Sequence, residues 1–115
     1  DFRGKYVVLD FWGSWCVWCI KGFPDMKKSY EKHKVKIEFI SIACRDSDAK
    51  WRTAVKENAL PWVQLFNDGK DIDVAALYAV NGYPTKCIID PEGKIVRIFS
   101  GESAEFYTYL DDLLK

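Results

Sequence analysis

Two cysteines separated by two residues, in the stretch Trp15-Cys16-Val17-Trp18-Cys19, are the residues of this sequence best suited to chemistry. An apolar run over Tyr6–Trp12 precedes them, and a helical pattern from Val17 to about Lys34 follows them. A strand that feeds a helix places Cys16 at or just before the helix N-terminus, where free backbone N–H groups and the helix dipole favour a thiolate. Cys19 then lies one turn further on, with its sulfur facing back toward Cys16. This spacing predicts a disulfide that opens and closes.

Half of a zinc site has the same cysteine spacing and is the alternative interpretation. Such a site usually has a second C-x-x-C or H-x3-H pair, and the sequence contains neither. The single histidine, His33, lies in a charged stretch, where we expect it to be exposed to solvent and without a role as base or ligand. We therefore favour redox chemistry and expect no metal site.

The composition is that of one globular domain. The 115 residues suit a single domain, and a chain that is 49% hydrophobic and 16% aromatic can build a core. Seventeen basic and seventeen acidic residues cancel, which gives no sign of a nucleic acid or an anionic membrane as partner. No apolar run is long enough to span a bilayer. Because the chain opens with Asp1 a few residues before a core strand, we expect residues 1–115 to be excised from a longer protein whose flanks would carry any membrane attachment.

Strands and helices alternate along the rest of the chain. After the helix that follows the cysteines, we expect a strand over Val35–Ala43, a helix over Ala49 to about Asn58, a strand over Trp62–Phe66, a short helix over Asp73 to about Tyr78, strands over Thr85–Asp90 and Lys94–Phe99, and a last helix from Ser103. The order β-α-β-α-β-α-β-β-α implies parallel crossovers followed by an antiparallel hairpin. It predicts a mixed sheet with helices on both faces.

Four pieces of the sequence carry a resemblance to a known family: Val8-Leu9-Asp10-Phe11-Trp12-Gly13-Ser14-Trp15-Cys16-Val17-Trp18-Cys19, Pro24, Gly82-Tyr83-Pro84-Thr85 and Ile89-Asp90-Pro91-Glu92-Gly93. Together they resemble the thioredoxin superfamily, and more closely its TlpA/ResA-like thiol-disulfide oxidoreductases. The resemblance spans nearly the whole chain and implies a thioredoxin-like, three-layer α/β/α fold with a central mixed sheet. The helix and strand over Ala49–Phe66 resemble the insertion that separates TlpA-like proteins from plain thioredoxins. The N-terminal hairpin with which TlpA-like domains usually begin is missing.

The resemblance implies a role for each member of the central motif. Cys16 would be the exposed nucleophile that forms a mixed disulfide with a substrate, and Cys19 would resolve that intermediate. Asp10 matches the buried acid beneath the second cysteine; burial should raise its pKa, so that it can exchange a proton with Cys19. The Cys16–Cys19 pair is then the redox group, and no other cofactor is expected. A static structural disulfide and a structural acid are the alternatives.

A second set of residues is expected to bind the substrate. Pro84 matches the family's cis-proline, which faces the disulfide and leaves the backbone of Tyr83 free to pair with an extended substrate segment. The alternative is an ordinary trans-proline at the start of a strand. Trp15 and Trp18 are predicted to form an aromatic rim, and Trp62 is a further candidate for it. Rings that only pack inside the protein are the alternative.

The other two cysteines are expected near the site. Cys44 ends a strand that should lie beside the strand before the motif, and Cys87 lies three residues after Pro84. We predict that each is a buried free cysteine that packs as a small apolar residue. A second, regulatory disulfide between them is the minority interpretation.

By resemblance, we expect a thiol-disulfide oxidoreductase that acts on protein thiols and disulfides and receives electrons from an upstream thiol donor. TlpA-like domains usually work outside the cytoplasm, either soluble in the periplasm or tethered to a membrane. Reduction of protein disulfides is the direction we favour, ahead of oxidation or isomerisation. A peroxiredoxin is the rival enzyme, but its Pro-x-x-x-Thr-x-x-Cys context is missing. A non-catalytic thioredoxin-like binding module is the other rival.

Overall fold

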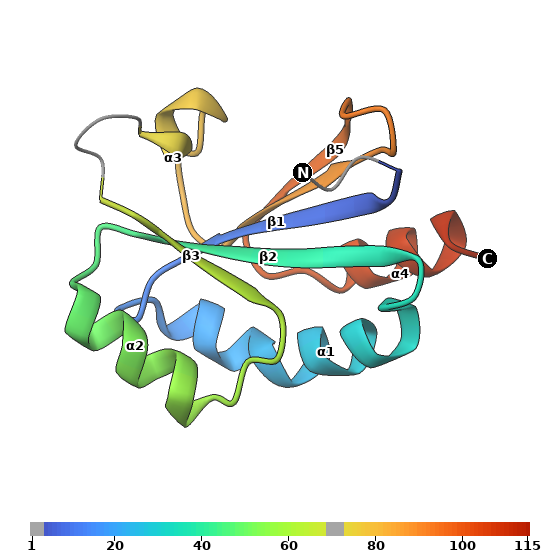
Figure 1. Ribbon diagram of the computed structural model, residues 1–115. Coiled ribbons are helices and arrows are strands. Elements are labelled where there is room, and N and C mark those ends of the chain that lie inside the picture. Colours follow the sequence, from blue (N-terminus) through green and yellow to red (C-terminus); the bar gives the residue numbers. More distant parts are fainter. Residues whose placement is uncertain (1–3, 69–72) are drawn as a thin grey trace.

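The computed structural model describes residues 4–68 and 73–115, which form a five-stranded sheet with helices on both faces (Figure 1). The elements are β1 (Tyr6–Trp12), α1 (Val17–His33), β2 (Ile37–Cys44), α2 (Asp48–Glu57), β3 (Val63–Asn67), α3 (Val74–Leu77), β4 (Thr85–Ile89), β5 (Ile95–Ser100) and α4 (Ala104–Leu113). Their order is the predicted one, and their ends differ from the prediction by about one or two residues, as is usual for frayed termini. At the largest difference β2 begins at Ile37, because Val35 is 82% exposed and precedes the pairing with β1.

The strand order in the sheet is β3-β2-β1-β4-β5. β1 runs parallel to β2, and β2 runs parallel to β3, whereas β4 is antiparallel to both β1 and β5. The sheet is therefore mixed, as predicted, with a parallel half and an antiparallel hairpin. β1 lies in the centre and is buried along almost its whole length, which explains its nearly continuous apolar sequence.

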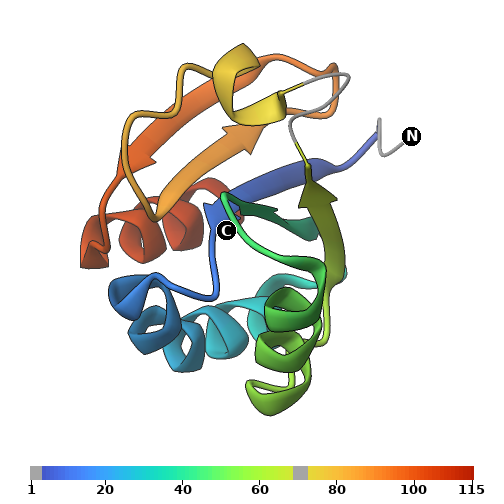
Figure 2. The same cartoon turned by 90° about the vertical axis from the view of Figure 1, so that its left-hand side faces the viewer.

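The helices are divided unequally between the two faces. Figure 1 shows α1, α2 and α4 below the sheet and α3 above it, and the turned view in Figure 2 shows the same layers. The larger core cluster lies between the sheet and the lower helices and includes both motif cysteines; its largest fully buried members are Trp12, Phe23, Met26, Phe39 and Phe106. A smaller cluster under α3 contains Val7, Leu9, Phe11, Ile42 and Cys87. The three-layer fold expected from the sequence is confirmed.

His33 differs from the prediction. It is buried at the end of α1, with 6% of its surface exposed, and its Nε2 lies 2.6 Å from Oδ1 of Asp111 on α4. The local sequence around His33 is charged, but α4 packs over this end of α1 and supplies the carboxylate. The expectation of a solvent-exposed histidine was therefore wrong, because the residue that covers it lies far away in the sequence.

Candidate active site

Cys16 and Cys19 form a disulfide where the loop after β1 enters α1, with their Cα atoms 5.3 Å apart. Cys16 is the N-cap of α1, and its Sγ accepts a hydrogen bond from the backbone N–H of Cys19 at 3.2 Å. A sulfur in this position can take a negative charge, because the unpaired N–H groups of the first helical turn point toward it. The predicted placement of the pair at the helix N-terminus is confirmed.

The expected exposure of Cys16 is not what the structure has. Cys16 is 5% exposed and Cys19 is 4% exposed, so both are buried in the disulfide form. The Cys16 sulfur is turned inward by its bond to Cys19 and by the N–H that it caps. The two cysteines therefore differ in helix position, Cys16 at the cap and Cys19 in the first turn, rather than in solvent exposure.

Asp10 is 1% exposed, and because side chains alternate along a strand it shares the face of β1 with Val8 and Trp12 of the larger core cluster. Its Oδ2 accepts a hydrogen bond from the Ser41 hydroxyl at 3.0 Å, and the Ser41 hydroxyl in turn accepts one from the Trp62 indole N–H at 2.7 Å. Its Oδ1 has no hydrogen-bond partner among the described residues, and the Lys86 ammonium lies 3.8 Å from it. Loss of water around the carboxylate raises the pKa of Asp10, and the charge of Lys86 and the Ser41 hydrogen bond oppose that rise.

The peptide bond between Tyr83 and Pro84 is cis, as predicted. Pro84 is fully buried, and the Thr85 hydroxyl closes the turn before β4 by donating to the Gly82 carbonyl at 2.6 Å. Burial raises the pKa of the Tyr83 hydroxyl to about 12, so Tyr83 stays neutral over the physiological range. This turn therefore presents a neutral, aromatic residue next to a fixed proline.

The three tryptophans proposed for an aromatic rim divide into two groups. Trp15 is 48% exposed and Trp18 is 64% exposed, and the Lys21 ammonium lies 4.9 Å from the Trp18 ring centroid. Trp62 is only 5% exposed and packs against core aromatic rings, so it does not belong to the rim. The sequence could not exclude Trp62, because its burial follows from the position of β3 beside β2.

Trp15 is exposed but held in place. Its indole N–H donates to the Cys44 carbonyl at 3.0 Å, and its ring meets the Tyr83 ring edge-on at a centroid distance of 5.3 Å. A Cβ added to Gly13 would overlap this indole, so the glycine makes room for the ring. The aromatic surface beside the cysteines is thereby attached both to the end of β2 and to the cis-proline turn.

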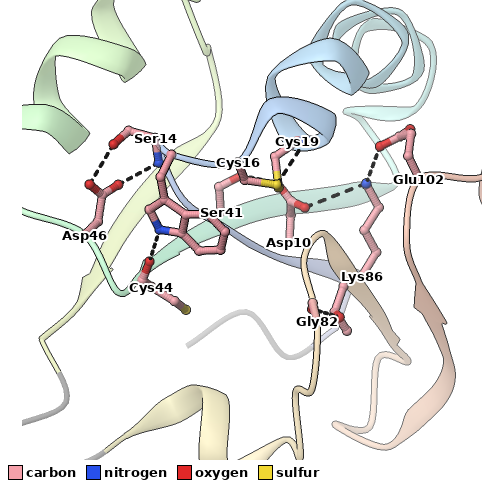
Figure 3. Close-up of a disulfide and its surroundings, with 12 residues drawn as sticks. Asp10, Ser14, Cys16, Cys19, Ser41, Cys44, Asp46, Gly82, Lys86 and Glu102 are labelled. Atoms are coloured by element: carbon pink, nitrogen blue, oxygen red, sulfur yellow. Dashed lines mark hydrogen bonds and ion pairs between the residues drawn. A yellow bond between two sulfur atoms is a disulfide. The ribbon is translucent and has the colours of Figure 1, made fainter.

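A carboxylate also fixes the loop before the cysteines. Asp46, just after β2, accepts hydrogen bonds from the Ser14 backbone N–H at 2.7 Å and from the Ser14 hydroxyl at 2.6 Å (Figure 3). The loop that carries Cys16 is therefore tied to the turn after β2. Sequence reasoning did not find this pair, because the two residues lie in loops that only the parallel pairing of β1 with β2 brings together.

Cys44 and Cys87 are both buried free thiols, which confirms the prediction. Burial raises the pKa of each thiol, that of Cys87 to about 11, so neither is a ready nucleophile. Within the described ranges 4–68 and 73–115, no three or more His, Cys, Asp or Glu side chains gather in a way that could hold a metal ion.

Sequence reasoning missed three residues around the buried acid: Ser41, Lys86 and Glu102. One signal was present, since Lys86 interrupts an apolar strand as Asp10 does in β1. Two opposite charges in two buried strands suggest a pair, but the pairing could be identified only with the strand order and register. Ser41 is uncharged and Glu102 lies after β5, so neither is a charge inside an apolar strand that could have drawn attention.

Residues 4–95 match the model of the protein family described as thioredoxin-like. Among curated proteins, the chain is similar to the thiol-disulfide oxidoreductase ResA of Bacillus thuringiensis subsp. konkukian, with 34% identity over 116 residues that cover 100% of this chain and 65% of the relative. The ResA protein of Bacillus subtilis is 34% identical over 107 residues, covering 91% of this chain and 58% of the relative. The chain thus spans less than two thirds of the length of these relatives.

Solved structures have the same fold. The thioredoxin domain of a thiol-disulfide oxidoreductase from Bacteroides vulgatus superposes with a TM-score of 0.90 at 31% identity, covering 100% of this chain and 83% of that one. A structure described as a putative thiol:disulfide interchange protein DsbE from Chlorobium tepidum gives a TM-score of 0.87 at 26% identity, covering 97% of this chain and 79% of that one.

Proposed function

The chain belongs to the thioredoxin-like family, and from that premise we propose that it is a thiol-disulfide oxidoreductase acting on protein substrates through Cys16 and Cys19. The observation that carries the proposal is the geometry of the pair. A disulfide closes over the N-terminus of α1, where the sulfur of Cys16 is the helix cap, and Asp10 lies in the strand that leads to it. Relatives named thiol-disulfide oxidoreductase ResA support the same assignment.

The proposed reaction begins with the reduced pair. The Cys16 thiolate, favoured by the helix N-terminus, attacks one sulfur of a substrate disulfide, so that a Cys16–substrate disulfide forms and one substrate thiolate leaves. Cys19 then gives its proton to Asp10 and attacks the Cys16 sulfur. The Cys16–substrate bond breaks, the Cys16–Cys19 bond forms, and the second substrate thiolate is released. Two electrons pass from the pair to the substrate, and an upstream thiol donor restores the dithiol.

The substrate segment is proposed to lie along the surface formed by Trp15, Trp18, Tyr83 and Pro84. Exposed indole rings beside the cysteines give apolar contact area to an unfolded or extended polypeptide. The backbone of Tyr83 precedes β4 and is proposed to pair with that segment as an added strand would. The redox group is the cysteine pair itself, so the proposed reaction uses no other cofactor.

Reduction of disulfides outside the cytoplasm, in the periplasm or an equivalent compartment, is the proposed direction and place of action. Support comes from the resemblance to TlpA/ResA-like proteins, which usually act there. None of the helices in the described part of the chain has the length and apolar character needed to cross a membrane.

The first test is an equilibrium titration of the pair against a glutathione redox buffer, followed by tryptophan fluorescence. A potential near that of thioredoxin, about −270 mV, supports a reductase, and a value near about −120 mV indicates disulfide formation or isomerisation instead. The Cys16→Ser/Cys19→Ser double variant is the control and should show no redox-dependent signal. If this variant retains full function with its partner, the chain is a binding module and the proposal is wrong.

A second test separates the two cysteines. The Cys19→Ser variant should accumulate a mixed disulfide with a reducible protein such as insulin, because nothing resolves the Cys16 intermediate. The Cys16→Ser variant should trap none, since Cys19 lies in the first turn of α1 and not at its cap, where the free N–H groups favour a thiolate. Trapping by Cys16→Ser and not by Cys19→Ser would reverse the assigned roles.

A further inference from the structure

Lys86 is a charged side chain in a place where lysine is rare. It is the second residue of β4, between Thr85 and Cys87, and 5% of its side chain is exposed. Lysine is almost never fully buried unless it is paired, because removing an ammonium group from water costs several kcal/mol. The groups that compensate this charge therefore matter to the molecule.

A carboxylate lies on each side of Lys86. Its Nζ is 3.8 Å from Oδ1 of Asp10 and 3.4 Å from Oε2 of Glu102, and Figure 3 shows the ammonium between the two acids. Lys86 is also the direct cross-strand partner of Asp10 in the antiparallel pairing of β4 with β1. The Phe106 ring of α4 lies over the ammonium, with its centroid 5.5 Å from Nζ. The lysine is thus held between the sheet and α4.

Glu102 joins this pair to the helix that carries the cysteines. It follows β5, and its carboxylate lies against α1 at Gly22, which is three residues after Cys19. A Cβ at Gly22 would overlap the carboxylate, so only glycine leaves this approach open. The side chain of Glu102 is 22% exposed, whereas those of Lys86 and Asp10 are almost completely buried. The three charges therefore extend from the interior beneath the active site toward the surface.

Asp10 has an oxygen available for a proton. Oδ2 accepts a hydrogen bond from Ser41. Oδ1 accepts none from the described residues and has the Lys86 ammonium 3.8 Å away. Two further titratable groups that interact with Asp10 are the thiol of Cys44 and the hydroxyl of Tyr107. Burial raises the pKa of both groups, so both stay neutral near pH 7, and the charge that opposes the raised pKa of Asp10 is that of Lys86.

We propose, on the basis of the proposed function, that Lys86 is a positioning residue that keeps Asp10 a carboxylate when Cys19 must give up its proton, and that Glu102 holds Lys86 in that place. A buried acid without a cation would keep its own proton and could accept none from Cys19. A cation at this distance lowers the pKa of a carboxyl group by about 1 to 3 units and so favours its ionised form. The carboxylate of Glu102 by itself would repel that of Asp10 and disfavour its ionised form. Glu102 can therefore help Asp10 only by holding the Lys86 ammonium in place.

The experiment measures the resolution step alone. Reduced protein is mixed with 5,5′-dithiobis(2-nitrobenzoate); the first thionitrobenzoate is released when Cys16 reacts, and the second when Cys19 attacks the mixed disulfide. The rate of the second release is followed by stopped-flow absorbance from acid to alkaline pH. The variants are Lys86→Met, which removes the charge, Lys86→Arg, which keeps it, and Lys56→Met, a matched change at an exposed helical position.

The Lys86→Met profile should move to higher pH by about 1 to 3 units, and Lys86→Arg should restore most of that shift. Lys56→Met should overlay the wild-type profile. A Lys86→Met profile that overlays the wild type, or a slower rate with an unmoved profile, overturns the proposal, since a packing role would give either result. If Lys86→Met does not fold, Lys86→Gln takes its place, because it keeps N–H donors for both acids. Failure of the proposed function looks different, since wild-type protein would then release no second thionitrobenzoate.

Discussion

The Ser41 hydroxyl lies between the Asp10 carboxylate and the Trp62 indole N–H, and its removal tests whether water can reach these buried groups. Its hydroxyl donates to Asp10 at 3.0 Å and accepts from the Trp62 indole N–H at 2.7 Å, and Ser41 has no exposed surface. Ser41→Ala removes both hydrogen bonds while changing the volume by a single oxygen atom. The indole N–H of Trp62 is then left without an acceptor inside the core.

The expected change in the free energy of unfolding follows from the two lost hydrogen bonds. An unsatisfied buried donor costs about 1–3 kcal/mol, and loss of the hydrogen bond to Asp10 adds about 0.5–1.5 kcal/mol, more if the carboxylate is charged. We therefore expect Ser41→Ala to lower the free energy of unfolding by about 2–4 kcal/mol. In a Trp62→Phe background the donor is gone, and the same substitution should cost only about 0.5–1.5 kcal/mol.

The assay is a double-mutant cycle of Ser41→Ala and Trp62→Phe, measured by urea unfolding of the oxidised protein. Far-UV circular dichroism is the signal, because one of the substitutions removes a tryptophan. The expected coupling is about 1–3 kcal/mol, the cost of the orphaned N–H. Free energies that add within about 0.5 kcal/mol would refute the reasoning and indicate that water reaches the indole once the hydroxyl is removed.

Three further predictions concern the helix ends, the buried acid and the loop before the cysteines. The hydrogen bond with His33 lowers the pKa of Asp111 below its usual 3.8, so the His33–Asp111 contact stabilises the fold above pH 3.8 and is lost as the pH falls through the lowered pKa. Asp111→Asn should therefore lower the free energy of unfolding in urea by about 1 kcal/mol at neutral pH and leave it unchanged in strong acid. Burial raises the pKa of Asp10 above 3.8, so the wild type loses stability as the pH rises from 3.8 to the raised value, and Asp10→Asn should be the more stable protein at pH 7. Gly13→Ala should displace the Trp15 indole, lower stability by about 1–3 kcal/mol and increase quenching of tryptophan fluorescence by acrylamide.

Matched substitutions control for each of these changes. Asp112→Asn removes the neighbouring exposed charge on α4, which pairs with Lys115 at the surface, and should change stability little. Gly82→Ala places a Cβ where nothing lies within 4 Å, so it should leave tryptophan quenching unchanged. A stability gain of Asp10→Asn that persists at low pH would show that it comes from packing and not from the proton.

The sequence predicted much of the fold because its strands and helices carry strong local signals. The apolar run of β1, the capping residues Ser47 and Ser103, and the helical periodicity of α1 are each readable without knowledge of the rest of the chain. The resemblance added what local signals cannot give, namely a buried Asp10 and a cis bond before Pro84, and the structure has both.

The predictions that were wrong all concern how far a side chain is exposed to solvent. His33 was expected at the surface and Trp62 near the rim, yet both are buried by elements that lie far from them in the sequence. Cys16 was expected to be exposed, but its sulfur turns inward to cap the helix and to bond Cys19. For His33 and Trp62 the burial is decided by tertiary contacts, for which the hydropathy of the neighbouring residues gives no information, whereas for Cys16 it is decided by the local disulfide and helix cap.

The surroundings of Asp10 show what the missing information is. β1 lies between β2 and β4, and the register places Ser41 on one side of Asp10 and Lys86 on the other, as its direct partners in the two ladders. Partners directly opposite each other across a ladder have side chains on the same face, so a hydroxyl and an ammonium lie beside the carboxylate without any loop to place them. A slip of one residue in either ladder would turn one partner to the other face of the sheet. The acid therefore owes its environment to strand register, and this is why its neighbours follow from the sequence only once the strand order and both pairings are known.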